Sequence, residues 1–114
     1  MARSATDHLR DVLEAIVAIE NYTRKGKREF ERNAMLRDAV VARLIQIGQA
    51  IKDAQAEGLD LPRLSPGIPW QSIAGMRDKL AHKYWLLDVE IVWAVVELEL
   101  PRLRTQVKKI LRRS

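Results

Sequence analysis

The sequence has no cysteine, which excludes disulfide bonds, thiol nucleophiles and cysteine-ligated zinc. Its two histidines leave little for a metal site, so neither a metal nor any other cofactor is expected. It also lacks an apolar run long enough to cross a bilayer, and its amino terminus has no signal-peptide pattern. We therefore expect a protein of the reducing cytoplasm that has no membrane partner.

The two-residue alternation of exposed strands is absent as well, whereas apolar residues recur at helical spacing almost throughout. The pattern predicts an all-α, antiparallel bundle of four to five helices, with residues 1–114 forming one domain. Gly48 lies inside the helix expected from about Arg28 to Glu57, where it should allow close helix packing. The first expected helix has Thr6 or Asp7 as its N-cap and ends before Gly26, and the second runs from about Arg28 to Glu57 with Gly58 as its cap. The third runs from Pro69 or Trp70 to about Leu80. The fourth starts after Asp88, and at Pro101 it either kinks or gives way to a new segment.

Charge of one sign dominates the carboxy-terminal segment, in a chain with a formal net charge of +5. From Pro101 onward there are six Lys or Arg residues and no acidic residue, and a second basic cluster spans residues 24–28. Two interpretations stay open. These cations either form a surface that follows phosphates, or they are solvated helix ends placed favourably near a helix dipole.

Reactive side chains are concentrated in one segment, residues 76–85, which reads Met-Arg-Asp-Lys-Leu-Ala-His-Lys-Tyr-Trp. On a helix, Asp78 and His82 are four residues apart and share a face, so the carboxylate can orient the imidazole. Arg77 and His82 are five apart and diverge by about 140°. For both to join one site, the helix must end near His82, or Arg77 must act across a subunit boundary.

These residue types suit cleavage of a phosphodiester without metal. His82 titrates in the physiological range and can take a proton from a ribose 2′-hydroxyl or return one to the leaving oxygen. Arg77 remains protonated, and its guanidinium suits the anionic phosphorane formed during attack. Attack by the 2′-hydroxyl restricts the substrate to RNA. The alternative is structural, with Arg77 and Asp78 paired on a helix surface while His82 caps its end.

Arg77, His82 and Tyr84 form an Arg-x4-His-x-Tyr pattern, and the segment before it, residues 68–76, reads Ile-Pro-Trp-Gln-Ser-Ile-Ala-Gly-Met. Through these residues the chain resembles the HepT (DUF86) toxins of the HEPN superfamily, and the similarity is not confined to them. It extends upstream through residues 39–50 and downstream to the Val-Trp pair at 92–93 and the Leu-Pro pair at 100–101. Nearly all of the sequence is therefore covered.

This resemblance implies a homodimer whose Arg77 and His82 motifs line a cleft at the subunit interface. It implies a ribonuclease that works without a metal cofactor. It also implies the toxin of a toxin–antitoxin system, encoded with an MntA-like minimal nucleotidyltransferase antitoxin that transfers AMP to the motif tyrosine, here Tyr84.

Two positions depart from the family pattern. Asp78 stands where the family often has Asn, and Gln49 replaces the Glu of a common Gly-Glu-Ala segment. These departures keep two other functions open. One is a catalytically inactive HEPN module that binds RNA or nucleotide with Arg77 and His82 as phosphate ligands. The other is a structural dimeric partner for a nucleotidyltransferase, docked through the cationic tail.

Overall fold

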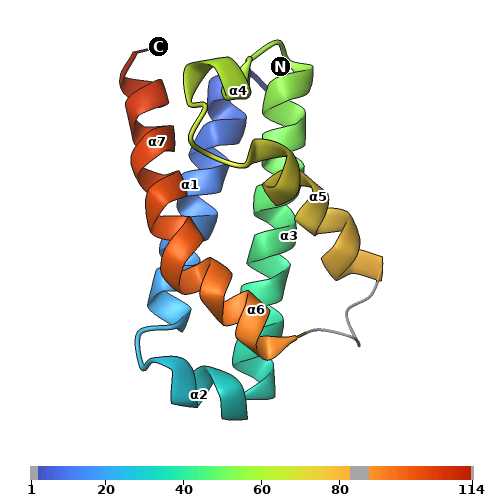
Figure 1. The fold of residues 1–114 in the computed structure, drawn as a ribbon, viewed down its shortest axis with the longest axis vertical. Coiled ribbons are helices and arrows are strands. Elements are labelled where there is room, and N and C mark those ends of the chain that lie inside the picture. Colours follow the sequence, from blue (N-terminus) through green and yellow to red (C-terminus); the bar gives the residue numbers. More distant parts are fainter. Residues whose placement is uncertain (1–2, 83–87, 114) are drawn as a thin grey trace.

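The computed structural model describes residues 3–82 and 88–113, without the side chain of His82. Every regular element in this part of the chain is helical, and Figure 1 shows α1, α3, α5 and the α6–α7 rod alternating in direction. The predicted all-α, antiparallel, HEPN-like bundle is confirmed. In order, the elements are α1 (Ala5–Tyr22), α2 (Lys27–Arg32), α3 (Ala34–Ala56), α4 (Leu61–Leu64), α5 (Trp70–His82), α6 (Val89–Ala94), the π-helical turn η2 (Val95–Glu99) and α7 (Leu100–Arg112).

The first helix begins earlier than predicted, because Ser4 and not Thr6 or Asp7 is the N-cap. The Ser4 hydroxyl accepts a hydrogen bond from the Asp7 backbone N–H at 3.2 Å, and the Ser4 N–H donates to the Asp7 carboxylate at 3.0 Å. This reciprocal pair is a capping box. The Ser4 backbone hydrogen bond, followed by the one with the Ser4 side chain, lowers the pKa of the Asp7 carboxyl.

The long second helix predicted for residues 28–57 is wrong as a single element, because Asn33 divides it into α2 and α3. Asn33 has extended backbone angles, and its side-chain oxygen accepts from the Leu36 N–H at 3.1 Å. Asparagine is among the best N-cap residues, so a new helix starts there. The break turns α2 across the end of the bundle, where Phe30 contacts Trp93 with ring centroids 5.3 Å apart.

The predicted helix end at Gly58 and the predicted helix start after Asp88 are confirmed. Gly58 has a φ of 100°, and its N–H donates to the Gln55 carbonyl while the Leu59 N–H donates to the Ala54 carbonyl. Asp88 is the N-cap of α6, and its carboxylate accepts from two backbone N–H groups. The short helix α4 was not predicted. It lies between the cap predicted at Gly58 and the helix predicted from Pro69 or Trp70, where no element was expected.

Pro101 interrupts the last helical rod, as predicted. The interruption is a π-helical turn, which the sequence did not reveal. Proline has no N–H to donate and its ring clashes with the carbonyl four residues earlier, here that of Glu97. The chain accommodates it through the π-helical turn η2, and α7 begins one residue ahead of Pro101.

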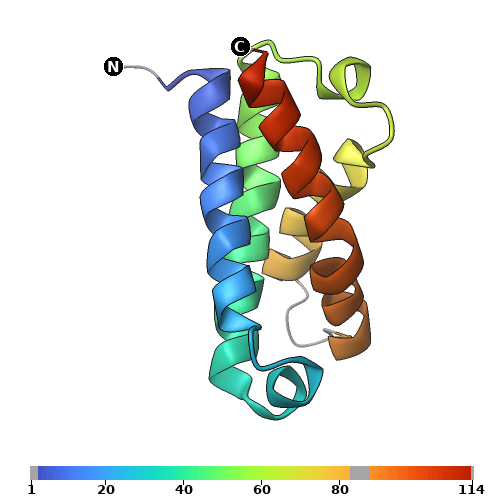
Figure 2. The ribbon, with the colours of Figure 1, turned by 90° about the vertical axis from the view of Figure 1, so that its left-hand side faces the viewer.

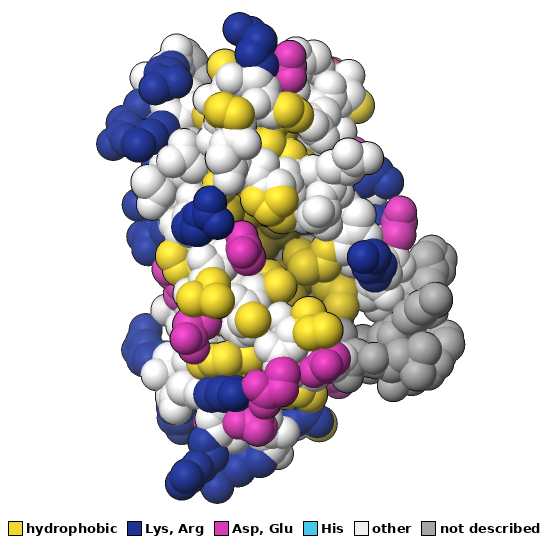
Figure 3. Space-filling model, in the orientation of Figure 1, with side chains coloured by type: hydrophobic (Ala, Val, Ile, Leu, Met, Phe, Trp, Pro, Cys, Tyr) yellow, Lys and Arg dark blue, Asp and Glu magenta, His cyan; other side chains and the backbone are white. Residues whose placement is uncertain are grey.

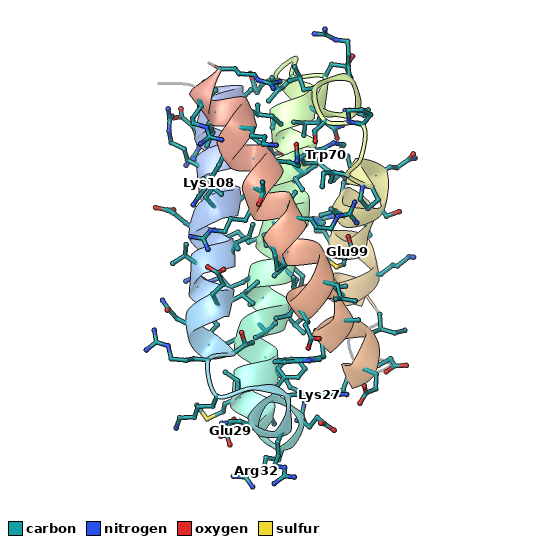
Figure 4. All side chains as sticks on the ribbon, turned by 60° about the vertical axis from the view of Figure 1, so that its left-hand side comes forward. Lys27, Glu29, Arg32, Trp70, Glu99 and Lys108 are labelled. Atoms are coloured by element: carbon teal, nitrogen blue, oxygen red, sulfur yellow. The ribbon has the colours of Figure 1, made fainter. Side chains whose placement is uncertain are left out.

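The core lies among α1, α3 and α7, which run side by side, and α5 packs on the opposite edge of α3 (Figure 2). α1, α3 and α7 each contribute residues at three-or-four spacing, such as Leu9, Val12 and Ile16 of α1. Trp70 anchors the start of α5, because its buried ring donates a hydrogen bond from Nε1 to the Ser65 carbonyl at 2.8 Å (Figure 4). None of the helices in the described ranges is long and apolar enough to span a membrane.

Candidate functional site

Helix α5 lies directly against α3 at Gly48. A Cβ atom built on Gly48 would lie 2.7 Å from the Arg77 Cβ, 3.1 Å from the Arg77 backbone nitrogen and 3.1 Å from the Ile73 carbonyl oxygen. Two of these three neighbours are backbone atoms of α5, so they can move only if the helix moves. The predicted role of Gly48 in close packing is confirmed, and the contact fixes the backbone of Arg77.

We expect Gly48→Ala to move α5 away from α3. Overpacking of this kind costs about 1–3 kcal/mol of unfolding free energy, and displacement of Arg77 should lower any cleavage of RNA by roughly tenfold or more. Urea denaturation and a cleavage assay measure the two effects.

Gly75→Ala on α5 is the matched control, because a Cβ there meets no atom of the described residues within 4 Å beyond its own stretch of helix. It removes a helical glycine and should stabilise the protein by up to about 1 kcal/mol. Equal stability and equal cleavage for the two variants would show that the Gly48 contact does not position Arg77.

The Arg77 side chain is 38% exposed, and its Nη1 donates to the Asp78 carboxylate at 2.6 Å. The other Asp78 oxygen lies 3.9 Å from the Lys52 ammonium on α3. Asp78 therefore holds two cations where α3 and α5 meet, as the surface-pairing interpretation expected. Its predicted orientation of His82 involves a side chain outside the description and stays a prediction.

A groove of about 310 Å³ opens beside Arg77, between α1, α3 and α5. We call it the Arg77 groove. Its polar lining comes from positions far apart in the sequence, so sequence reasoning missed most of it. His8 could have been noticed only because the sequence contains just two histidines. The polar side chains are His8 and Asp11 of α1, Gln46, Gln49 and Asp53 of α3, and Arg77.

Gln49, one of the departures from the family pattern, has a defined contact in this groove. Its amide Nε2 donates to the Asp53 carboxylate at 2.8 Å. A glutamate at position 49 would instead place two carboxylates one helical turn apart, where like charges repel. The groove keeps the Asp53 carboxylate, so the replacement at position 49 does not remove negative charge from it altogether.

The profile of the family described as ribonuclease HepT-like matches residues 12–110. The chain belongs to this family. Its HepT-like relatives include a protein of Thermococcus cleftensis named "Probable ribonuclease HepT", which is 39% identical over 111 residues that make up 96% of this chain and 98% of that protein. The resemblance inferred from the sequence is confirmed at the level of the family.

Two relatives come from Methanocaldococcus jannaschii. One, named "Putative RNase", is 36% identical over 105 residues, which are 91% of this chain and 84% of that protein. The other, named "Gamma-glutamylcyclotransferase and putative RNase", is 36% identical over 112 residues, which are 97% of this chain and only 49% of that longer protein. No solved structure matches the chain.

The matched region contains the whole predicted motif of this HepT-like chain. Arg77 and Asp78 lie on α5, and His82 is the last residue of that helix. Tyr84, the predicted AMP acceptor, lies outside the described residues. Among the side chains that the structure describes, no group of three or more His, Asp or Glu residues is placed to hold a metal ion.

Proposed function

We propose that this HepT-like chain is a metal-independent endoribonuclease that cleaves RNA by His-assisted attack of the 2′-hydroxyl. One observation carries the proposal. Arg77 is fixed against α3 at Gly48 and lines an open groove, on the same helix as His82. Membership of the family supports it, since the relatives above are named as ribonucleases.

In the proposed reaction, His82 takes the proton of the 2′-hydroxyl, and the resulting oxygen nucleophile attacks the adjacent phosphorus. Arg77 stabilises the negative charge that builds on the phosphorane oxygens. The 5′-oxygen of the next nucleotide leaves as that bond breaks, and it receives the proton that His82 returns. The products are a 2′,3′-cyclic phosphate and a 5′-hydroxyl end.

The purified protein should cleave RNA in the presence of EDTA, because this reaction uses no metal-bound water. Total RNA and a single-stranded oligonucleotide serve as substrates, and mass spectrometry identifies the ends. Replacing the ribose at the cut position by 2′-deoxyribose should abolish cleavage there. Loss of cleavage on chelation, or ends carrying a 5′-phosphate, would contradict the mechanism.

We also propose a biological setting, which rests on the family resemblance. Residues 1–114 would act as one HEPN domain in a cytoplasmic homodimer, with the two Arg77 and His82 motifs lining a shared cleft. A partly exposed Arg77 beside an open groove is compatible with closure by a second chain. The protein would be the toxin of a HepT–MntA-like pair, neutralised when a minimal nucleotidyltransferase transfers AMP to Tyr84.

One contact favours a second candidate, a catalytically inactive module that binds RNA or nucleotide. The guanidinium of Arg77 already holds the Asp78 carboxylate at 2.6 Å, so incoming phosphate must compete with a fixed negative charge. Turnover separates the two functions. The inactive module would bind RNA through Arg77 and leave every strand intact after prolonged incubation.

A further inference from the structure

A row of cations runs along one face of α7. Arg104, Lys108 and Arg112 recur every four residues, which corresponds to about 6 Å of rise along the helix for each step. We call these three residues the basic row. Lys108 and Arg112 are exposed and take part in none of the ion pairs found among the described side chains. Arg104 is held by Glu20, whose carboxylate lies 3.0 Å from its Nη1.

Arg104 and Lys108 of the basic row border a wide hollow of about 610 Å³, which is lined by residues of α1, α3 and α7. Figure 3 shows Lys and Arg side chains along this edge of the molecule, and Figure 4 shows Lys108 on the side of α7 that faces α1. The floor of the hollow is apolar, and Val17 in it is 44% exposed. The lining residues are Leu13, Glu14 and Val17 of α1, Arg43 of α3, and Arg104 and Lys108 of α7.

This hollow is connected to the Arg77 groove by one hydrogen bond. Arg43, which lines the hollow, donates from Nη1 to the side-chain oxygen of Gln46 at 3.1 Å, and Gln46 lines the groove. The second Arg43 nitrogen, Nη2, donates to the Tyr22 hydroxyl at 3.4 Å. Arg43 is therefore held in place by both contacts, and residues of α1 and α3 line both depressions.

We infer that the basic row and its hollow are a second RNA-binding site. This site holds phosphates of the same strand, next to the nucleotides that enter the Arg77 groove. This inference rests on the proposed function. Evenly spaced cations on an open surface suit the repeated phosphates of a flexible strand. The described lining contains no aromatic side chain on which a base could stack, so the site contacts the backbone and reads no sequence.

Nucleic acid fits this surface better than an acidic protein does. A protein partner needs a defined, well-packed patch, whereas this surface offers a long row of separate charges above a shallow floor. The hollow beside the row also shares helices α1 and α3 with the groove that contains Arg77. A single strand can occupy both sites at once, and each bound phosphate then adds to its affinity.

The test measures binding without cleavage. Fluorescence anisotropy follows a fully 2′-O-methylated single strand of about 12 nucleotides, in which no 2′-hydroxyl is free to attack. Lys108→Gln/Arg112→Gln should weaken binding roughly tenfold at 0.1 M salt and make the slope of log K against log salt less negative by about 1.4. A 2′-O-methylated trinucleotide, which is too short to span both sites, should lose much less affinity in this variant than the long strand does.

Lys109→Gln/Arg113→Gln is the matched control, because it removes the same charge from the same end of α7 on a different face. It should bind the long strand nearly as wild type does. Equal weakening by the two variants would show that net charge alone matters, and no weakening by either would remove the basic row from binding. Preferential, row-dependent binding of polyglutamate over RNA would point to an acidic protein and overturn the inference.

Glu14 provides a change in the opposite direction, since its carboxylate lines the hollow that phosphates would enter. Glu14→Gln should tighten binding of the long strand by roughly two- to fivefold at 0.1 M salt. Glu31→Gln, on α2 and away from the hollow, is the control and should have a smaller effect. Equal gains for both variants would contradict the placement of the strand.

Binding of the methylated strand tests the second site, and cleavage of ordinary RNA tests the ribonuclease function. If the methylated strand binds through the basic row but ordinary RNA is not cleaved, the second site is supported and the proposed ribonuclease function is contradicted. Cleavage of ordinary RNA at the Arg77 groove, with binding that ignores the basic row, would do the reverse.

Discussion

Replacement of His82 or Arg77 by alanine is expected to lower RNA cleavage by about 10²–10⁴-fold in the presence of EDTA. His82 is the only histidine in the motif and supplies the proton-transfer group of the proposed reaction. Arg77 supplies the guanidinium that stabilises the phosphorane, and Arg77→Lys should rescue only part of the activity, because lysine keeps the charge but lacks the planar fork. Single-turnover rates on one oligonucleotide measure all three variants.

The comparison needs a measure of folding and of assembly. The Arg77 side chain is partly exposed and outside the core, so Arg77→Ala should unfold at nearly the same urea concentration as wild type. Light scattering should give wild type and both alanine variants twice the 13.1 kDa mass of one chain. A monomer would contradict the shared cleft. Equal cleavage by wild type and both alanine variants would remove the motif from the mechanism.

The sequence predicted the helical class and several helix ends, because these depend on local chemistry. Asp88 caps α6 and Gly58 adopts a positive φ, and each can be inferred from the residue type and its neighbours. The break at Asn33 was missed because apolar residues continue on both sides of it, so periodicity alone does not reveal it. The π-helical turn before Pro101 was missed because a proline in a helical rod predicts a kink or a break without specifying its form.

The site divides in the same way. The motif residues could be found because they are neighbours in the sequence, and the resemblance to the HepT family assigned their roles. The remaining lining of the Arg77 groove comes from α1 and α3, and only the packing of those helices against α5 brings His8 and Asp53 near Arg77. The importance of Gly48 could be suspected, but its partner could not, since that depends on which turn of α5 lies opposite.

Co-expression with a cognate minimal nucleotidyltransferase is expected to add AMP to Tyr84 and to suppress toxicity. Tyr84 follows His82 by two residues, so a group on its phenolic oxygen would lie close to the motif in the chain. The phenol is protonated at neutral pH and becomes an acceptor when the transferase activates it. Its oxygen attacks the α-phosphorus of a nucleoside triphosphate, pyrophosphate leaves and the phenolic proton is lost. The added phosphate and nucleoside would exclude RNA by charge and by bulk.

Intact mass spectrometry after co-expression should show additions in steps of one AMP moiety on the wild-type chain. Tyr84→Phe should show none, and cells producing it should stop growing even with the transferase present, because phenylalanine has no acceptor oxygen. His82→Ala/Tyr84→Phe is the control and should be harmless if toxicity comes from RNA cleavage. Suppressed toxicity with an unchanged wild-type mass would mean that the transferase neutralises its partner by binding alone. Additions that persist in Tyr84→Phe would place the acceptor at another residue.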